Sequence, residues 1–296
     1  MKSIFLLLML LYSFVSKSQT DNYFDRLSAI ENNGIVFYNI DGYVITSQIL
    51  NAEFSEKELR KIYKKCSIKK SDNITKDDSL LFNNIYVAKS KKIVDSLIQN
   101  TSYYFIENAN KTISVIFFGC MNKYDRNFER TFIYLILGNR IPQGCFNSPK
   151  TDSINFAGRK IALGGNCRWM NVNTIQCEYH GEMNWSVHKN FEDAKNSIES
   201  QFRLTKSRKM GKIISEEIVD IIFEGAKTKA KKVVYRITGV NALLVGLSGG
   251  KTLTIYYVAA EVRNNYVSCV LSYWNNDIIN ESGLPYLLEQ VMQLKK

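Results

Sequence analysis

Two stretches of this 296-residue chain resemble each other at a constant offset of 140 residues, and this similarity constrains the fold more than any other feature. Residues 89–97 (KSKKIVDSL) align with residues 229–237 (KAKKVVYRI), and residues 111–118 (KTISVIFF) align with residues 251–258 (KTLTIYYV), without a gap. Similarity at a fixed offset is typical of a repeated structural unit. The sequence therefore predicts a tandem duplication of one module.

Weaker similarity around these matches sets the boundaries of the two copies. Gly42 aligns with Gly181 at an offset of 139, and residues 132–135 align with residues 270–273 at an offset of 138. Loops absorb one-residue shifts of this kind at little cost. The turn-forming stretch between the copies has no counterpart and is expected to be a linker. The expected organisation is a signal peptide (1–18), a first copy (19–140), a linker (141–159) and a second copy (160–296).

The N-terminus has the pattern of a secretory signal peptide. Lys2 precedes the apolar residues 4–11, and the small residues Ser16 and Ser18 stand where a signal peptidase reads the chain. The apolar run is too short for a stable membrane span, and no later run reaches the roughly 18 apolar residues of a transmembrane helix. The sequence thus predicts cleavage after Ser18 and an exported protein, periplasmic or extracellular, without a transmembrane segment after signal removal.

The charge balance is basic. The formal net charge is +11, and it falls to +9 when Lys2 and Lys17 leave with the signal peptide. An excess of this size favours acidic partners such as nucleic acid, an anionic glycan or a lipid headgroup surface. Charges of both signs are scattered along the chain, however, and this distribution favours a solvated basic surface over a dedicated polyanion site.

Secondary structure is clearest in the second copy. A hairpin is expected around Gly181, followed by a helix over residues 191–204 with Asn190 as its N-cap. Four β-rich runs then follow at hairpin spacing, which is typical of an antiparallel meander. These runs are residues 232–238, 242–248, 251–262 and 266–274.

The first copy repeats this order, with strands around residues 41–42, a helix at about 55–66 and strands from residue 90 onward. Residues 78–88 and 215–226 are ambiguous between helix and strand, and we favour a helix in both. Residues 284–294 are expected to form a closing helix.

These elements predict an α+β fold in which each copy is an antiparallel meander of about four to six strands covered by one or two helices. Val233, Tyr235 and Ile237 alternate with Val234 and Arg236, so one face of that strand should be buried and the other partly wet. The surface between the copies is the natural place for a ligand groove.

Residues 246–252 (GLSGGKT) resemble a phosphate-binding P-loop, but the spacing before Gly250 is one residue short. A P-loop joins a strand to a helix, whereas Lys251 begins a β-rich run. The segment is therefore predicted to be a hairpin turn.

The cysteines favour a disulfide over a metal site. Cys177 and His180 are three residues apart and would point to opposite faces of a strand, and with Cys167 and His188 they match no zinc pattern. If residues 171–173 form a three-residue hairpin loop, Cys167 faces Cys177 at a distance that a disulfide can span, in an oxidising compartment. Cys120 and Cys269 are expected to be buried thiols, and Cys66 and Cys145 stay unassigned.

The lysines are what the two copies share. Lys89, Lys91 and Lys92 align with Lys229, Lys231 and Lys232. They form either solvated strand edges guarded against strand addition or two cationic patches for an anionic ligand. Because a buried, unpaired ammonium costs several kcal/mol, Lys91 and Lys231 should be exposed on equivalent surfaces.

These observations predict a non-catalytic exported binding or interaction protein, with an anionic glycan, a lipid headgroup or another envelope protein as candidate partners. The first alternative is a secreted hydrolase acting on an envelope or host polymer, and the second is a protein-docking or inhibitory module that uses a sheet edge. No catalytic residue, metal ligand or cofactor is predicted.

Overall fold

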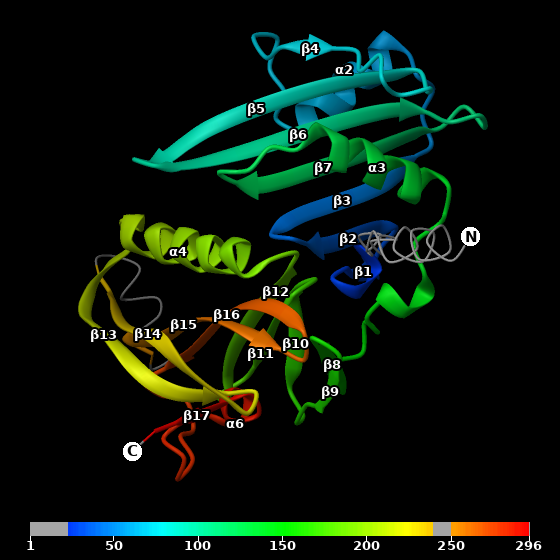
Figure 1. The fold of residues 1–296 in the computed structure, drawn as a ribbon. Helices are drawn as coiled ribbons and strands as arrows, with labels where there is room; N and C mark the ends of the chain where they lie inside the picture. Colours follow the sequence, from blue (N-terminus) through cyan, green and yellow to red (C-terminus); the bar gives the residue numbers. More distant parts are fainter. Residues whose placement is uncertain (1–22, 239–249, 296) are drawn as a thin grey trace, which may run out of the picture.

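The computed structural model describes residues 23–238 and 250–295, which form two units built on large antiparallel sheets (Figure 1). The predicted signal peptide and the run at residues 242–248 lie outside the described residues. The first unit comprises η2 (Tyr23–Asp25), β1 (Ser28–Asn32), β2 (Ile35–Ile40), β3 (Tyr43–Leu50), α2 (Glu56–Lys65), β4 (Ile74–Thr75), β5 (Asn84–Val94), β6 (Leu97–Glu107), β7 (Ile113–Met121) and α3 (Arg126–Leu137).

The second unit follows a short connection and a small hairpin. The connection contains η3 (Gln143–Cys145), and the hairpin is β8 (Ser153–Phe156) with β9 (Arg159–Ala162). The remaining elements are β10 (Cys167–Asn171), β11 (Thr174–Cys177), β12 (Gly181–His188), α4 (Phe191–Ser207), β13 (Gly211–Phe223), β14 (Ala226–Ile237), β15 (Thr252–Val262), β16 (Asn265–Trp274), α6 (Tyr286–Glu289) and β17 (Met292–Leu294).

The two large sheets have related strand orders, β1-β2-β3-β7-β6-β5-β4 and β10-β11-β12-β16-β15-β14-β13-β17. In each, three strands and a helix precede a second meander whose last long strand pairs with the third strand. In this order β5 occupies the same position as β14. Residues 89–94 of the first sequence match lie on β5, and residues 229–237 lie on β14.

The second sequence match is wrong as a structural correspondence. Val115 lies on β7, the strand next to β3, whereas Ile255 lies on β15, which β16 separates from β12. Residues 132–135 belong to α3, but residues 270–273 belong to strand β16. Apolar runs of this length suit a helix and a strand equally well, so similarity between them does not fix a register.

Helices cover both faces of the first sheet. Ser55 caps α2, whose buried Leu59 and Ile62 pack on one face together with Val87 and Phe105. Asp125 caps α3, whose Phe128, Phe132 and Ile133 pack on the opposite face. Each cap oxygen accepts a backbone N–H that would otherwise lack a partner at the start of the helix.

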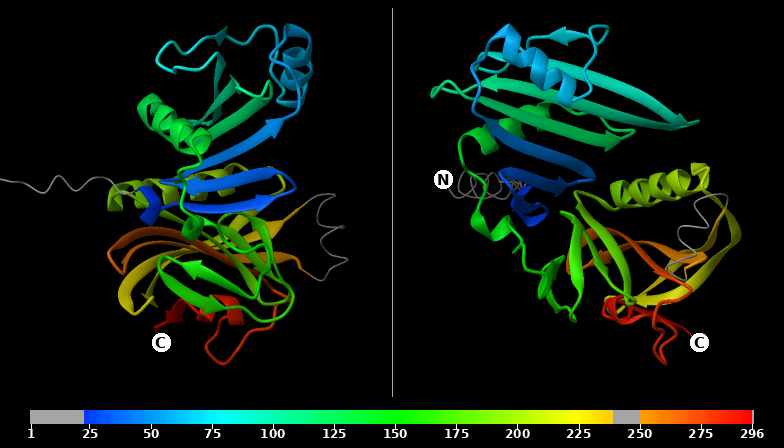
Figure 2. Two further views of the ribbon diagram at one scale, coloured as in Figure 1. Left: turned by 90° about the vertical axis from the view of Figure 1, so that its right-hand side faces the viewer. Right: turned by 180° about the vertical axis from the view of Figure 1, so that it is seen from behind.

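In the second unit, α4 lies on the face of the sheet that is turned toward the first unit (Figure 2). Asn190 Oδ1 accepts a hydrogen bond from Asp193 N at 2.8 Å, which confirms the predicted N-cap. Ala194, Ile198 and Phe202 recur every four residues and form one face of the helix. Ile198 and Phe202 pack over β14, β15 and β16, while β8, β9 and α6 cover the other face of the sheet.

Strand β14 has the two faces that its sequence predicts. Val233 and Tyr235 are buried against α4, Val234 is half-buried and Arg236 is exposed.

The predicted helices at residues 78–88 and 215–226 are both wrong. Residues 78–83 form no helix and β5 begins at Asn84, while residues 215–223 belong to strand β13. The run 218–222 (IVDII) is rich in β-branched residues, and pairing with β14 and β17 satisfies its backbone as a strand. Two further predictions are corrected in part. The expected linker contains β8, and the expected closing helix is the single turn α6 followed by β17.

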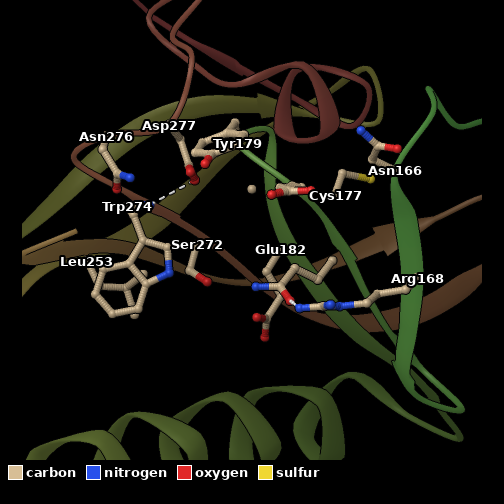
Figure 3. A pocket seen from close by; sticks show the side chains of 13 residues that line it. Asn166, Arg168, Cys177, Tyr179, Glu182, Leu253, Ser272, Trp274, Asn276 and Asp277 are labelled. Atoms are coloured by element: carbon tan, nitrogen blue, oxygen red, sulfur yellow. Dashed lines mark hydrogen bonds between the residues drawn. The ribbon is translucent and has the colours of Figure 1, made fainter. Parts of the chain in front are cut away.

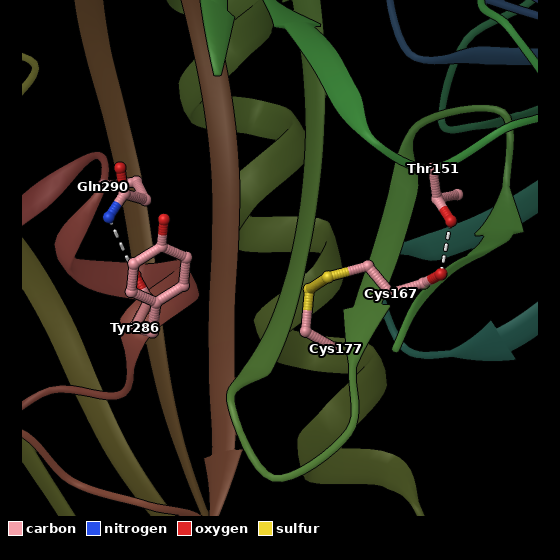
Figure 4. Close-up of a disulfide and its surroundings, with 5 residues drawn as sticks. All are labelled: Thr151, Cys167, Cys177, Tyr286 and Gln290. Carbon is pink, nitrogen blue, oxygen red and sulfur yellow. Dashed lines mark hydrogen bonds between the residues drawn. A yellow bond between two sulfur atoms is a disulfide. The ribbon is translucent and has the colours of Figure 1, made fainter. Parts of the chain in front are cut away.

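Cys167 and Cys177 form the predicted disulfide and face each other on β10 and β11 (Figure 4). Near the turn the register shifts by one residue, so that Asn171 pairs with Thr174 and Met170 is displaced. Cys66 is half-buried, and Cys120, Cys145 and Cys269 are buried free thiols. None of the described helices is both long enough and apolar enough to cross a membrane.

Removing this disulfide should destabilise the second unit. The bond closes a loop with a sequence separation of 10 residues, and closing a loop of that size stabilises a fold by about 2.5 kcal/mol. Urea denaturation of a Cys167→Ser/Cys177→Ser variant should show this loss, and a reductant should lower the stability of the unaltered protein equally. The matched control, Cys66→Ser, should keep the sensitivity to reductant. Equal stability of the unaltered protein with and without reductant would contradict the prediction.

Candidate functional site

The repeated lysines are mostly paired with carboxylates of their own unit. Lys89 Nζ lies 2.8 Å from Asp72, Lys92 lies 2.7 Å from Asp95 and Lys232 lies 2.8 Å from Glu217. Lys229 lies 3.8 Å from Asp220. Exposed pairs of this kind stabilise little, but each one neutralises a cation that a ligand could use.

Lys91 is exposed as predicted, whereas the prediction for Lys231 is wrong. The side chain of Lys231 is only 24% exposed, and its Nζ lies 3.6 Å from both Glu199 on α4 and Glu216 on β13. It also lies 3.8 Å from the centre of the Phe202 ring. Binding of an anionic ligand by the six lysines stays a prediction, and the described geometry lends it little support.

A different feature stands out on the α4 side of the second sheet. Glu182, Asn184, Ser186 and His188 alternate along β12, and strand geometry puts all four side chains on the face that α4 partly covers. The residues opposite them extend this polar face sideways. Gln176 pairs with Glu182, Thr174 pairs with Asn184, and Arg168 continues the row on β10. We call the four β12 side chains with Arg168, Thr174 and Gln176 the polar strip.

The polar strip borders the apolar contact of α4. The helix buries its apolar face against β14, β15 and β16, while β10 and β11 extend beyond it. The two parts of this sheet face therefore have different chemistry, with aliphatic and aromatic side chains under α4 and amide, hydroxyl and charged side chains beside it.

A groove of about 610 Å³ lies along the strip, between the first unit, β12 and α4. Its charged side chains are largely paired: Asp41 with Arg26 at 2.8 Å, Asp193 with Lys123 at 3.7 Å and Glu199 with Arg203 at 3.0 Å. Most of the other polar side chains that line the groove are neutral amides and hydroxyls, including those of Asn39, Asn122, Asn184, Asn196, Ser186 and Ser200. The groove lies between the two units, where the sequence placed a ligand site.

His188 lies at the end of the strip, at the contact between the units. It is 2% exposed, and its Nε2 lies 2.8 Å from Ser268 Oγ. Its Nδ1 is buried and has no hydrogen-bond partner within residues 23–238 and 250–295. Burial lowers the pKa of His188 to about 4, although the nearby carboxylates of Asp41 and Asp193 oppose this shift. A Cβ at Gly42 would lie 3.4 Å from the imidazole, and the backbone N–H of Asp41 donates to Val187 O at 3.1 Å.

A second cavity, of about 260 Å³, lies at the other end of the strip (Figure 3). Trp274 and Leu253 form an apolar wall, and Tyr179, Glu182 and Asp277 contribute polar groups. We call this cavity the Trp274 pocket. Burial raises the pKa of both Glu182 and Asp277. The charge of Arg208 opposes this shift at Glu182. At Asp277, the shift is opposed by the backbone N–H of Trp274, which donates to Oδ2 at 2.9 Å.

Sequence reasoning expected a ligand groove between the units but identified none of the residues of the polar strip or of the Trp274 pocket. The alternation of polar residues with Met183, Trp185 and Val187 along residues 182–188 was the available signal. Such alternation is typical of any strand with one wet face, so it does not distinguish a binding face from a solvated one. No group of three or more His, Cys, Asp or Glu residues suited to a metal ion occurs within residues 23–238 and 250–295.

Comparisons with known proteins do not assign the chain to a family. No protein-family model and no curated protein matches it. Among solved structures, the chain is similar to the crystal structure of the di-domain ARO/CYC StfQ from the steffimycin biosynthetic pathway. The sequence identity is 10%, the match covers 90% of this chain and 77% of that chain, and the TM-score is 0.17.

Proposed function

We propose that this chain is an exported, non-catalytic binding protein that holds an oligosaccharide along the polar strip, in the groove between its two units. The observation that carries the proposal is the groove itself, because a cavity of about 610 Å³ is lined by neutral amide side chains from both units and by hydroxyl side chains from the second. Export rests on the N-terminal sequence pattern, with which the disulfide is compatible.

Hydroxyl-rich ligands suit this surface better than peptides or polyanions do. The strip is a sheet face, and the backbone groups of β12 are paired with β11 and β16, so an extended peptide cannot add to it as a strand. The charged side chains that line the groove are largely held in ion pairs, so the groove offers a polyanion little free positive charge. Each sugar hydroxyl both donates and accepts, which matches Asn and Ser side chains.

A hydrolase receives less support from the same residues. Ser268 is hydrogen bonded to His188 but is only 1% exposed, so a substrate cannot reach its hydroxyl without a rearrangement. In the Trp274 pocket, the pKa values of Glu182 and Asp277 are both raised. Glycosidases instead need two carboxyl groups whose pKa values are pushed apart, with one ionised. The hydrolase and docking alternatives stay predictions.

The related strand orders of the two sheets support a second proposal, that the units arose by duplication. The correspondence would then join β5 with β14, β6 with β15 and β7 with β16. The ungapped alignment of residues 111–118 with residues 251–258 is not part of this proposal.

Binding to neutral oligosaccharides tests the proposed function. A screen of neutral envelope and host oligosaccharides should give a ligand whose affinity falls about fivefold to tenfold in Asn184→Ala and in Asn196→Ala, since one lost hydrogen bond costs about 1 kcal/mol. Asn196 is exposed on α4, so its replacement should leave the fold intact. The matched control is Asn32→Ala on β1, which is exposed and remote from the groove. Calorimetry that finds no ligand, or a ligand that neither variant weakens, would contradict the proposal.

A further inference from the structure

We propose that the Trp274 pocket is a subsite for a positively charged group of the ligand, the ammonium group of an amino sugar. This inference rests on the proposed function and names the class of sugar that the strip binds. Its basis is the combination of an aromatic wall, an excess of carboxyl groups and a cavity that opens onto the strip.

Among the described residues, the pocket is lined by more carboxyl groups than basic side chains. Glu178, Glu182 and Asp277 all line it, and none of the three forms an ion pair with another residue in the described ranges. Asp277 Oδ2 accepts the backbone N–H of Trp274 at 2.9 Å. The one basic lining residue among those described, Arg168, donates to Gln176 Oε1 at 2.9 Å. Among its described lining residues, the pocket therefore has three carboxyl groups and one cation, and the guanidinium of that cation is hydrogen bonded to a neutral amide.

The aromatic residues favour a cation as well. Trp274 is half-buried and its ring forms one wall of the cavity, and Tyr179 lies at the opposite side of the pocket beside Asp277 (Figure 3). The negative face of an indole attracts an ammonium group, and this attraction grows when the site is partly shielded from water. Aromatic rings also pack against the apolar face of a sugar ring, so one residue can serve both parts of an amino sugar.

Electrostatics agree with this geometry. Burial raises the pKa of Glu182 and Asp277, because the pocket disfavours their charged forms while it is empty of a cation. The other charged or titratable groups acting on them are Arg208, which lowers the pKa of Glu182, and His180, which lowers that of Asp277. An incoming ammonium would favour the ionised carboxylates, so its binding should release protons.

Glu182 also connects the pocket with the groove. It is the first of the four β12 side chains in the strip, two residues from Asn184, which lines the groove. Side chains two residues apart on a strand lie roughly 7 Å from each other on the same face. One ligand can thus place an amine in the pocket and its hydroxyl groups along the strip.

The test compares a tetramer of N-acetylglucosamine with its fully de-N-acetylated counterpart, which carries free amines in place of the acetamido groups. Calorimetry at about pH 6, where those amines are protonated, should show at least about tenfold tighter binding of the amine form. Asp277→Asn should reduce that preference to about twofold or less and leave the affinity for the neutral tetramer unchanged, because Asp277 lies outside the polar strip. Glu182→Gln should also reduce the preference to about twofold or less. The matched control, Glu261→Gln on β15, removes an exposed carboxylate outside the pocket and should keep the preference.

The outcomes separate this inference from the proposed function. Equal binding of both tetramers, or a preference that survives both carboxyl replacements, overturns the amine subsite while the neutral tetramer still reports on the groove. Monomeric glucosamine gives the converse control. If it binds and Asp277→Asn abolishes its binding, but neither tetramer responds to Asn184→Ala or Asn196→Ala, then the subsite stands and the groove proposal fails.

Discussion

Acidification from pH 6.5 to pH 4 should remove about 3 kcal/mol of stability through His188 alone. Burial lowers the pKa of His188 from 6.5 to about 4. The unfolded chain therefore binds this proton first as the pH falls. The contribution of His188 to the free energy of unfolding is complete above pH 6.5, decreases steadily toward pH 4 and does not change further below that value. Each unit of pKa shift corresponds to about 1.4 kcal/mol.

Urea denaturation across this pH range, on the unaltered protein and on His188→Gln, measures the effect. Glutamine can replace the Nε2 contact with Ser268 but cannot take up a proton in this range, and the titrations of the carboxyl groups cancel in the comparison. The His188→Gln variant should lose less stability on acidification than the unaltered protein does. His180→Gln, the control at the second histidine of the chain, should behave like the unaltered protein. Parallel pH profiles for His188→Gln and the unaltered protein would show that His188 is not held neutral by burial.

Asp77→Asn should destabilise the first unit by about 3 kcal/mol. The side chain of Asp77 is 2% exposed. Its carboxylate accepts hydrogen bonds from Arg126 at 2.6 Å and from Arg130 at 3.0 Å. These bonds connect residues 76–82 to the start of α3. Although burial raises the pKa of this carboxyl group, the bonds from Arg130 and Ser79 and the charge of Arg126 outweigh it, and the pKa is lowered. Removing one partner of a buried pair leaves the other charges uncompensated.

The neighbouring residue supplies the control for this prediction. Asp78 has a side chain that is 89% exposed, and Asp78→Asn should change the free energy of unfolding by less than about 0.5 kcal/mol. Thermal or urea denaturation of both variants at neutral pH gives the comparison. An Asp77→Asn variant as stable as Asp78→Asn would mean that this buried network does not hold the first unit together.

Local signals in the sequence predicted much of the second unit. Caps and turns are short-range features, so Asn190 marked the start of α4 and the spacing around residues 171–173 brought Cys167 opposite Cys177. The β-rich runs at residues 251–262 and 266–274 correspond closely to β15 and β16. In these places, backbone propensity and local pairing agree with the final fold.

Long-range pairing decided the segments that were predicted wrongly. Residues 215–223 satisfy a helical pattern and a strand pattern equally well, and only the partners β14 and β17 select the strand. The ion pairs of the lysines could not be predicted from the sequence for a similar reason. Their partners Asp72, Glu216 and Glu217 come from other elements, so the sequence shows the positive charges without the neutralisation that the fold provides.

The groove along the polar strip is formed by both units together. Alternation along β12 can be read from the sequence, but the groove exists because α4 covers the neighbouring strands and the first unit approaches from the other side (Figure 1). Gly42 is 146 residues away from His188 in the sequence, yet the packing of the units brings Gly42 next to the imidazole and Asp41 into a hydrogen bond with Val187.

A crystal structure with an oligosaccharide bound tests the central claim most directly. Density for sugar rings along Ser186, Asn184 and Glu182, between α4 and the first unit, is the result that we predict. Density confined to the exposed surface around Lys91, or at the outer edge of either sheet, would contradict the account, because the groove between the units would then not be the binding site.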